Sequence, residues 1–81
     1  MTSIDRLARA GINLRISKII ISDEIAVHFE SAYVKDGCFL CGEFGRGDTV
    51  EEAAADYIKK LEGKTIVVEP SSKNRREILF L

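Results

Sequence analysis

The segment 49–61 constrains the fold of this chain most, because its apolar residues recur with the period of an α-helix. Thr49 and Glu52 have the spacing of a capping box at its start, and Gly63 can end it. The apolar positions share one face of such a helix and form a continuous stripe: Val50, Ala53, Ala54, Tyr57, Ile58 and Leu61. The sequence therefore predicts an amphipathic helix with one side that must pack against another element.

Most of the chain before this helix alternates apolar and polar residues with the period of two that is typical of strands. We expect three strands, over residues 12–21, 25–34 and 38–45. The turns Ser22-Asp23 and Asp36-Gly37 join them as hairpins.

A short helix over residues 3–10, with Ser3 as its N-cap, precedes these strands. Two further strands, over residues 64–69 and 77–81, follow the main helix. The expected order is α-β-β-β-α-β-β. We predict one small α+β domain over residues 1–81, an antiparallel meander with the main helix packed on one face.

The strand register follows by counting if each hairpin turn holds two residues. Ile21 then faces Glu24, and Lys35 faces Cys38. This register pairs apolar residues of neighbouring strands on one face: Ile16 with Phe29, Ile20 with Ile25, Tyr33 with Leu40, and Phe29 with Phe44.

The opposite face of this predicted sheet carries more large apolar residues than a fully solvated face would. Arg15 also lies there, and the register places it beside Glu30 as an ion pair. We expect a partner surface formed by Ile19, Ile21, Val34, Phe39 and Arg15. Either the N-terminal helix covers part of this face, or another chain does. A second copy would make a homodimer.

The composition argues against several classes of function and indicates no particular one. The chain has 81 residues, with twelve basic and thirteen acidic side chains and a net charge of −1. This balance gives no strong field for nucleic acid or for an anionic membrane. No stretch approaches the roughly 20 apolar residues that a membrane span needs. The N-terminus has no apolar signal core, and two cysteines without a framework are typical of a reducing compartment, so we expect a cytoplasmic protein.

No group of residues has the pattern of a catalytic or metal site. Cys38 and Cys41 have C-x-x-C spacing, but residues three apart on a strand point to opposite faces. We expect Cys38 in the core and Cys41 on the outer face. His28 is the only histidine, and no nucleophile or orienting carboxylate accompanies it. We therefore expect no enzyme, no metal and no cofactor.

Two loops are candidate anion sites: the loop before the main helix, and the loop between the last two strands. Gly45-Arg46-Gly47 precedes the helix, where acidic residues at positions 48, 51 and 52 would repel a phosphate. We expect its glycines to allow a tight strand-to-helix turn. Lys73, Arg75 and Arg76 form the one basic cluster, so an alternative function is a nucleic-acid-binding module that uses this loop.

The order α-β-β-β-α, with Gly45-x-Gly47-x-Thr49 leading into Ala53-Ala54, resembles the double-stranded-RNA-binding domain. That family has a lysine cluster where this chain has Glu51 and Glu52, so the resemblance implies the fold rather than RNA binding. The run 47–53 is also similar to the HicB-like antitoxin domain, in which a three-stranded sheet precedes the helix.

A third resemblance covers residues 29–81 and is to small uncharacterised proteins of phages and prophages. The residues that carry it are Phe29-Glu30, Gly45-Arg46-Gly47-x-Thr49-x-x-Glu52-Ala53, Asp56-Tyr57, Leu61-x-Gly63-Lys64 and Arg76-Glu77-Ile78. It implies a non-enzymatic accessory or protein-interaction protein, such as a host-directed inhibitor. We expect it to dock through the outer sheet face or an edge strand.

Overall fold

A computed structural model describes residues 2–81 of the chain. In this range it shows two helices and seven strands, with the strands arranged in two antiparallel sheets. The α+β class and the main helix packed on a sheet are confirmed. In chain order the elements are α1 (Ser3–Ala8), β1 (Leu14–Ile19), β2 (Glu24–Phe29), β3 (Ala32–Asp36), β4 (Phe39–Cys41), β5 (Gly45–Gly47), α2 (Val50–Leu61), β6 (Lys64–Val68) and β7 (Arg76–Phe80).

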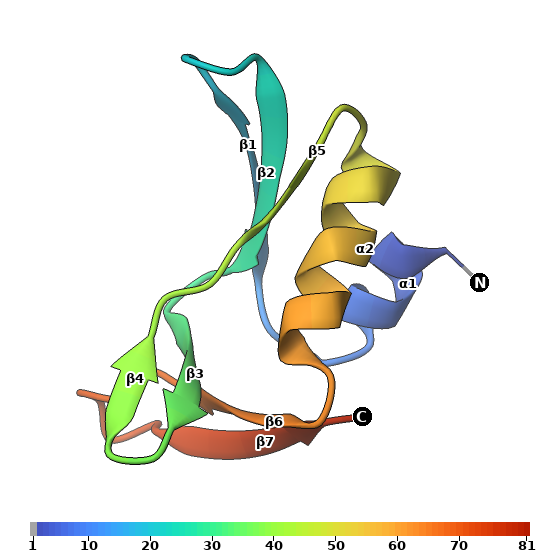
Figure 1. The fold of residues 1–81 in the computed structure, drawn as a ribbon. Helices are drawn as coiled ribbons and strands as arrows, with labels where there is room; N and C mark the ends of the chain where they lie inside the picture. Colours follow the sequence, from blue (N-terminus) through green and yellow to red (C-terminus); the bar gives the residue numbers. More distant parts are fainter. Residues whose placement is uncertain (1) are drawn as a thin grey trace.

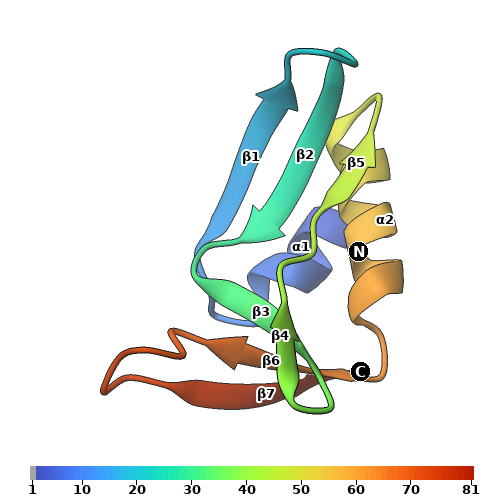
Figure 2. The ribbon, with the colours of Figure 1, turned by 60° about the vertical axis from the view of Figure 1, so that its left-hand side comes forward.

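The first sheet has the strand order β1-β2-β5, and the second has the order β4-β3-β6-β7. Helix α2 packs on the first sheet against β2 and β5, and α1 packs against α2 (Figure 1). Both helices therefore lie on one side of the first sheet, and the second sheet closes one end of the molecule (Figure 2). Strand β1 lies at the edge of the first sheet opposite β5.

The predicted strand 25–34 is broken at a corner, where the chain passes from one sheet to the other. Ser31 takes a left-handed conformation there, with φ of 54°. This extra residue changes which side chains face the core: Val27 and Phe29 are buried before the corner, and Val34 is buried after it. The alternation rule places Val34 outside and Tyr33 inside, and the corner reverses both.

The predicted strand 38–45 is divided in the same way. Strand β4 pairs with β3 in the second sheet, whereas β5 pairs with β2 in the first, with Gly45 opposite Val27. The single three-stranded meander that we expected is therefore two sheets that share the corner. The predicted pairing of Phe29 with Phe44 does not form, because the pairing of β5 with β2 ends at Gly45, in a register that differs by one residue from the predicted one.

Both hairpins are present, but each register is shifted by two residues from the prediction. Glu24 pairs with Ile19 and not with Ile21 as predicted, because residues 20–23 form a longer turn. Asp23 has a φ of 61°, and its N–H donates to the Ile19 carbonyl at 2.8 Å. A shift of two leaves every side chain on its predicted face of the hairpin.

In the second hairpin, Asp36 pairs with Phe39, and the turn consists of Gly37 and Cys38. Gly37 supplies the positive φ, 60°, at the first turn position. Leu40 therefore pairs with Lys35 and not with Tyr33.

The apolar stripe of α2 is the centre of the core, as predicted. Tyr57 packs edge-on against Phe29, with the ring centroids 5.4 Å apart. Leu7 of α1 is also fully buried. The core cluster combines both helices and both sheets: Leu7, Ile12, Val27, Phe29, Val34, Ala53, Ala54, Tyr57, Ile58, Leu61, Ile66, Val68 and Phe80.

The glycines before α2 serve close packing. Neither has a positive φ, so the tight turn that we predicted does not need them. A Cβ on Gly45 would lie 2.1 Å from the Ala53 carbonyl oxygen, and a Cβ on Gly47 would lie 2.8 Å from the Glu52 Cβ. Both glycines let β5 lie directly on the helix.

The two helix starts are linked to each other. In α2 the Thr49 hydroxyl accepts the N–H of Glu52 at 3.1 Å, which is one of the two bonds of the predicted capping box. The N-cap of α1 is Thr2 rather than Ser3, and Asp5 completes a capping box with it. Both oxygens of the Glu51 carboxylate then accept the N–H of Ser3, at 3.0 and 3.1 Å. Glu51 thus holds the start of α1 against the start of α2.

Candidate functional site

The main candidate site on the surface is the edge of β1 that has no neighbouring strand. The Asn13 carbonyl accepts the N–H of Glu30 at 2.7 Å, so Asn13 directs its backbone groups toward β2. Backbone direction alternates along an antiparallel strand. The N–H and C=O groups of Leu14, Ile16 and Lys18 therefore point away from β2, to the side where the sheet has no further strand. We call these three residues the β1 edge.

Strand β5, the other edge of the first sheet, is covered by side chains of α2. The Asp56 carboxylate accepts the N–H of Arg46 at 3.0 Å, and Lys60 donates to the Phe44 carbonyl at 2.8 Å. The N–H of Arg46, helped by Lys60, holds the pKa of Asp56 below its usual value. These contacts occupy backbone groups that an incoming strand would need.

The edges of the second sheet are also protected. Strand β4 is only three residues long. Strand β7 begins with charged residues, and Arg6 donates to the carbonyl of Leu81 just beyond its end. Short length, charge and side-chain cover are the usual protections of edge strands. Within residues 2–81, β1 is the one six-residue edge on which no side chain bonds to the outward backbone groups.

Large aliphatic side chains accompany the β1 edge. Ile16 is 51% exposed, although it faces the helix side, because α2 packs mainly on β2 and β5. Ile20 and Ile21, in the turn after β1, are 92% and 100% exposed. Such a group on a small domain is typical of an interaction site.

The two cations of β1 are each paired within the chain. Arg15 bonds to Glu30 at 3.4 Å, which was predicted, and Lys18 bonds to Asp23 at 2.8 Å. Charge on an edge strand normally repels another strand. Here each positive charge is paired with a carboxylate of the same chain, so its repulsion of an incoming strand is reduced.

The partner surface expected from the sequence is divided between several places. Ile19 and Arg15 lie on the outer face of β1, and Ile21 lies in the turn beyond it. Val34 is in the core, because of the corner at Ser31. Phe39 is exposed but belongs to β4, at the far edge of the second sheet. The structure therefore keeps the β1 part of that surface together and separates the rest.

A shallow hollow lies on the outer face of the first sheet, with a volume of about 420 Å³. Helix α1 does not cover it, since α1 packs against α2 on the other side (Figure 2). His28 lies in it and faces the Phe29 carbonyl with its Nδ1 at 3.0 Å. The residues that line the hollow are Ser17, Ile19, Ala26, His28, Glu43 and Phe44.

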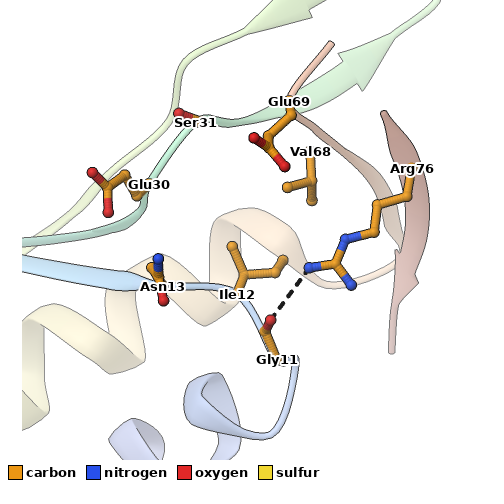
Figure 3. A pocket seen from close by; sticks show the side chains of 8 residues that line it. All are labelled: Gly11, Ile12, Asn13, Glu30, Ser31, Val68, Glu69 and Arg76. Carbon is orange, nitrogen blue, oxygen red and sulfur yellow. Dashed lines mark hydrogen bonds between the residues drawn. The ribbon is translucent and has the colours of Figure 1, made fainter. Parts of the chain in front are cut away.

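A second cavity, of about 340 Å³, lies where the two sheets meet (Figure 3). Arg76 reaches across it and donates to the Gly11 carbonyl at 3.3 Å. At its rim the N–H of Glu69 donates to the Ser31 carbonyl at 2.8 Å, and both of these residues have a positive φ. Because these bonds tie β7 to the segment before β1 and tie β6 to the corner, we interpret the cavity as the joint between the sheets.

The residues considered for chemistry lie apart from one another. Cys38 is exposed in the β3–β4 turn, and Cys41 is half-buried opposite Val34 on the core side of its sheet. This corrects the prediction that Cys38 is in the core and Cys41 outside. The shifted register moves Cys38 out of the strand and into the turn, and the corner turns the face that carries Val34 and Cys41 toward the core. No group of three or more His, Cys, Asp or Glu side chains in residues 2–81 has the arrangement of a metal site.

The basic loop does not present three free cations. Arg75 pairs with Glu77 at 3.2 Å, and Arg76 is turned toward Gly11. Lys73 is exposed. Together with Lys35 at 3.3 Å, Arg75 holds the pKa of Glu77 below its usual value. The cluster that the sequence suggested as a phosphate contact is therefore mostly used within the chain.

Neither helix in residues 2–81 is long and apolar enough to cross a membrane. Comparisons with protein-family models, curated proteins and solved structures find no match to this chain. The fold is a small α+β domain with two antiparallel sheets, and its function has to be inferred from its own surface.

Proposed function

We propose that this chain is a non-enzymatic protein-interaction module that docks through the β1 edge. One observation supports this most: Leu14, Ile16 and Lys18 offer six outward backbone groups on a strand that no side chain of residues 2–81 covers. An exposed edge of this kind accepts another strand by continuing the sheet.

The exposed isoleucines support the same proposal. Ile16, Ile20 and Ile21 lie on or next to the β1 edge, and they are among the most exposed large aliphatic side chains of the domain. Main-chain hydrogen bonds would supply part of the affinity, and these side chains would supply apolar contact. The resemblance to phage and prophage proteins adds the proposal that the chain acts as an accessory factor or a host-directed inhibitor.

The proposal is tested by photo-cross-linking in cells that naturally produce the protein. A photoreactive phenylalanine analogue is placed at Ile16, and in a matched variant at Leu79. Leu79 is 57% exposed, close to the 51% of Ile16, but lies on the second sheet. We expect position 16 to give a discrete covalent adduct with a protein, and position 79 to give none.

Adducts of the same mass and yield from both positions would contradict docking at the β1 edge. An absence of any adduct at position 16 would also count against it, because a docked strand would lie within reach of that side chain.

A further inference from the structure

We propose that the partner at the β1 edge is a second copy of this chain, whose β1 pairs antiparallel with the first across a two-fold axis at Ile16. The inference rests on the proposed function, since it names the occupant of the same edge. This strand pairing would join two three-stranded sheets into one sheet of six strands, with strand order β5-β2-β1-β1-β2-β5.

The symmetry of an edge pairing restricts the register. A two-fold axis perpendicular to the sheet reverses the strand direction and keeps the faces, so both α2 helices lie on the same side. The outward backbone groups belong to residues 14, 16 and 18, and these must pair with one another. An axis at Ile16 pairs Leu14 with Lys18 of the second copy, Ile16 with Ile16, and Lys18 with Leu14.

This register uses every outward group of the β1 edge. Three residues on each copy exchange one N–H and one C=O, so no main-chain group of Leu14, Ile16 or Lys18 is left without a partner. On the outer face it places Arg15 opposite Ser17 of the second copy. No two like charges lie directly opposite each other.

Neighbouring two-fold registers are worse for identifiable reasons. An axis at Arg15 places two arginines opposite each other, and an axis at Lys18 does the same with two lysines, which is destabilising across a strand pair. An axis at Ser17 pairs Leu14 with Ile20, which lies in the turn and not in the strand. The axis at Ile16 is the register that satisfies both charge and hydrogen bonding.

The side chain at the axis also fits a second copy. Ile16 is half-exposed on the helix side, and α2 leaves the space above β1 open. Directly opposite residues in an antiparallel pair have Cβ atoms about 5 Å apart, so the two Ile16 side chains would cover each other. A six-residue strand pairing is small compared with a standard interface, so we expect a reversible, concentration-dependent dimer.

The first experiment measures the oligomeric state of the purified full chain by sedimentation equilibrium over a range of concentrations. We expect a monomer–dimer equilibrium. Ile16→Lys places two ammonium groups at the axis, and we expect it to raise the dimer Kd by about tenfold or more. The matched control is Leu79→Lys, because Leu79 is 57% exposed, close to the 51% of Ile16, but lies on the second sheet and outside the pairing. Its Kd should equal that of the parent chain.

The second experiment tests the register. Single cysteines replace Arg15, Ile16 or Ser17 in a background with Cys38→Ser and Cys41→Ser, and mild oxidation traps pairs. Opposite Cα atoms at a hydrogen-bonded pair are about 5.5 Å apart, which a disulfide can span. We expect the cysteine at position 16 to give the highest yield of covalent dimer. A maximum at position 15 or 17 would overturn the proposed axis.

The outcomes separate this inference from the proposed function. A chain that stays monomeric at millimolar concentration would overturn the second copy as occupant. If position 16 then still gives a photo-adduct with a different protein, docking at the β1 edge stands with another partner. If neither dimer nor adduct forms, both fail.

Discussion

Tyr57 shows how one side chain joins the main helix to the first sheet. Its hydroxyl accepts the N–H of Phe29 at 3.0 Å, at the end of β2. Strand β5 pairs with Ile25 and Val27 but does not reach as far as Phe29, so the phenol takes the place of a missing strand residue. The ring is buried, and this burial raises the pKa of Tyr57 above its ordinary value of 10.0.

Tyr57→Phe removes the acceptor and leaves the Phe29 N–H buried without a partner. We expect the free energy of unfolding to fall by about 1–3 kcal/mol at pH 7, measured by urea denaturation. A raised folded pKa gives stability that is complete below the unfolded value and is lost as pH rises through the folded value. The difference in free energy of unfolding between the parent chain and the variant should therefore become smaller above pH 10. A difference that widens there would contradict the raised pKa, and an unchanged free energy of unfolding at pH 7 would contradict the bond.

Gly45 and Gly42 offer a matched pair of glycines close in sequence. A Cβ on Gly45 meets the Ala53 carbonyl at 2.1 Å, whereas a Cβ on Gly42 meets only Tyr33 at 3.9 Å, an ordinary contact. We expect Gly45→Ala to destabilise the domain by about 3 kcal/mol or more, because β5 would have to move off the helix. Gly42→Ala should be neutral or slightly stabilising, by up to about 1 kcal/mol. Thermal unfolding of both variants checks this, and equal effects would rule out the close packing.

At the scale of elements, the position of α1 decides what the outer sheet face can do. The sequence allowed α1 either to cover that face or to leave it open. The Glu51 carboxylate holds the first turn of α1 against α2, so the outer face stays uncovered. This contact joins residues 48 positions apart, and local patterns do not predict it.

Glu51→Gln and Glu52→Gln distinguish this contact from general charge effects. Both remove one negative charge from the first turn of α2, so both lose the same helix-dipole interaction. Only Glu51 bonds to Ser3. We expect Glu51→Gln to cost about 0.5–1 kcal/mol more and to speed amide hydrogen exchange in α1. Similar exchange rates in the two variants would show that Glu51 does not hold α1.

At the scale of the whole molecule, the corner at Ser31 creates two sheets from strands that the sequence shows as continuous. The corner directs β3 into the second sheet and leaves β1 as a long edge of the first. The candidate interaction surface is therefore a consequence of how the sheets divide. The sequence predicted docking through the outer sheet face or an edge strand, but the residues that it named belong to the outer face, and one of them, Val34, lies in the core.

Dimerisation through the β1 edge would couple stability to protein concentration, because association stabilises the folded state only. For a domain of this size, 1 kcal/mol shifts Tm by roughly 4–8 °C. We expect Tm, measured by calorimetry, to rise by several degrees between about 10 μM and 1 mM. Ile16→Lys should make Tm independent of concentration, and Leu79→Lys should not. A flat Tm in the parent chain would contradict the coupling.

Elements with local sequence signals could be predicted from the sequence. Helix α2 starts at Thr49 and buries its stripe as predicted, because capping and periodicity act within a few residues. The Arg15–Glu30 ion pair and the existence of both hairpins were predictable for the same reason. The corner at Ser31, the exchange of Cys38 and Cys41, and the free edge of β1 depend instead on tertiary contacts. They follow from which distant strands pair: β5 lies beside β2, and β6 and β7 join β3 and leave β1 free. The apolar alternation is the same for other pairings, so it does not distinguish them.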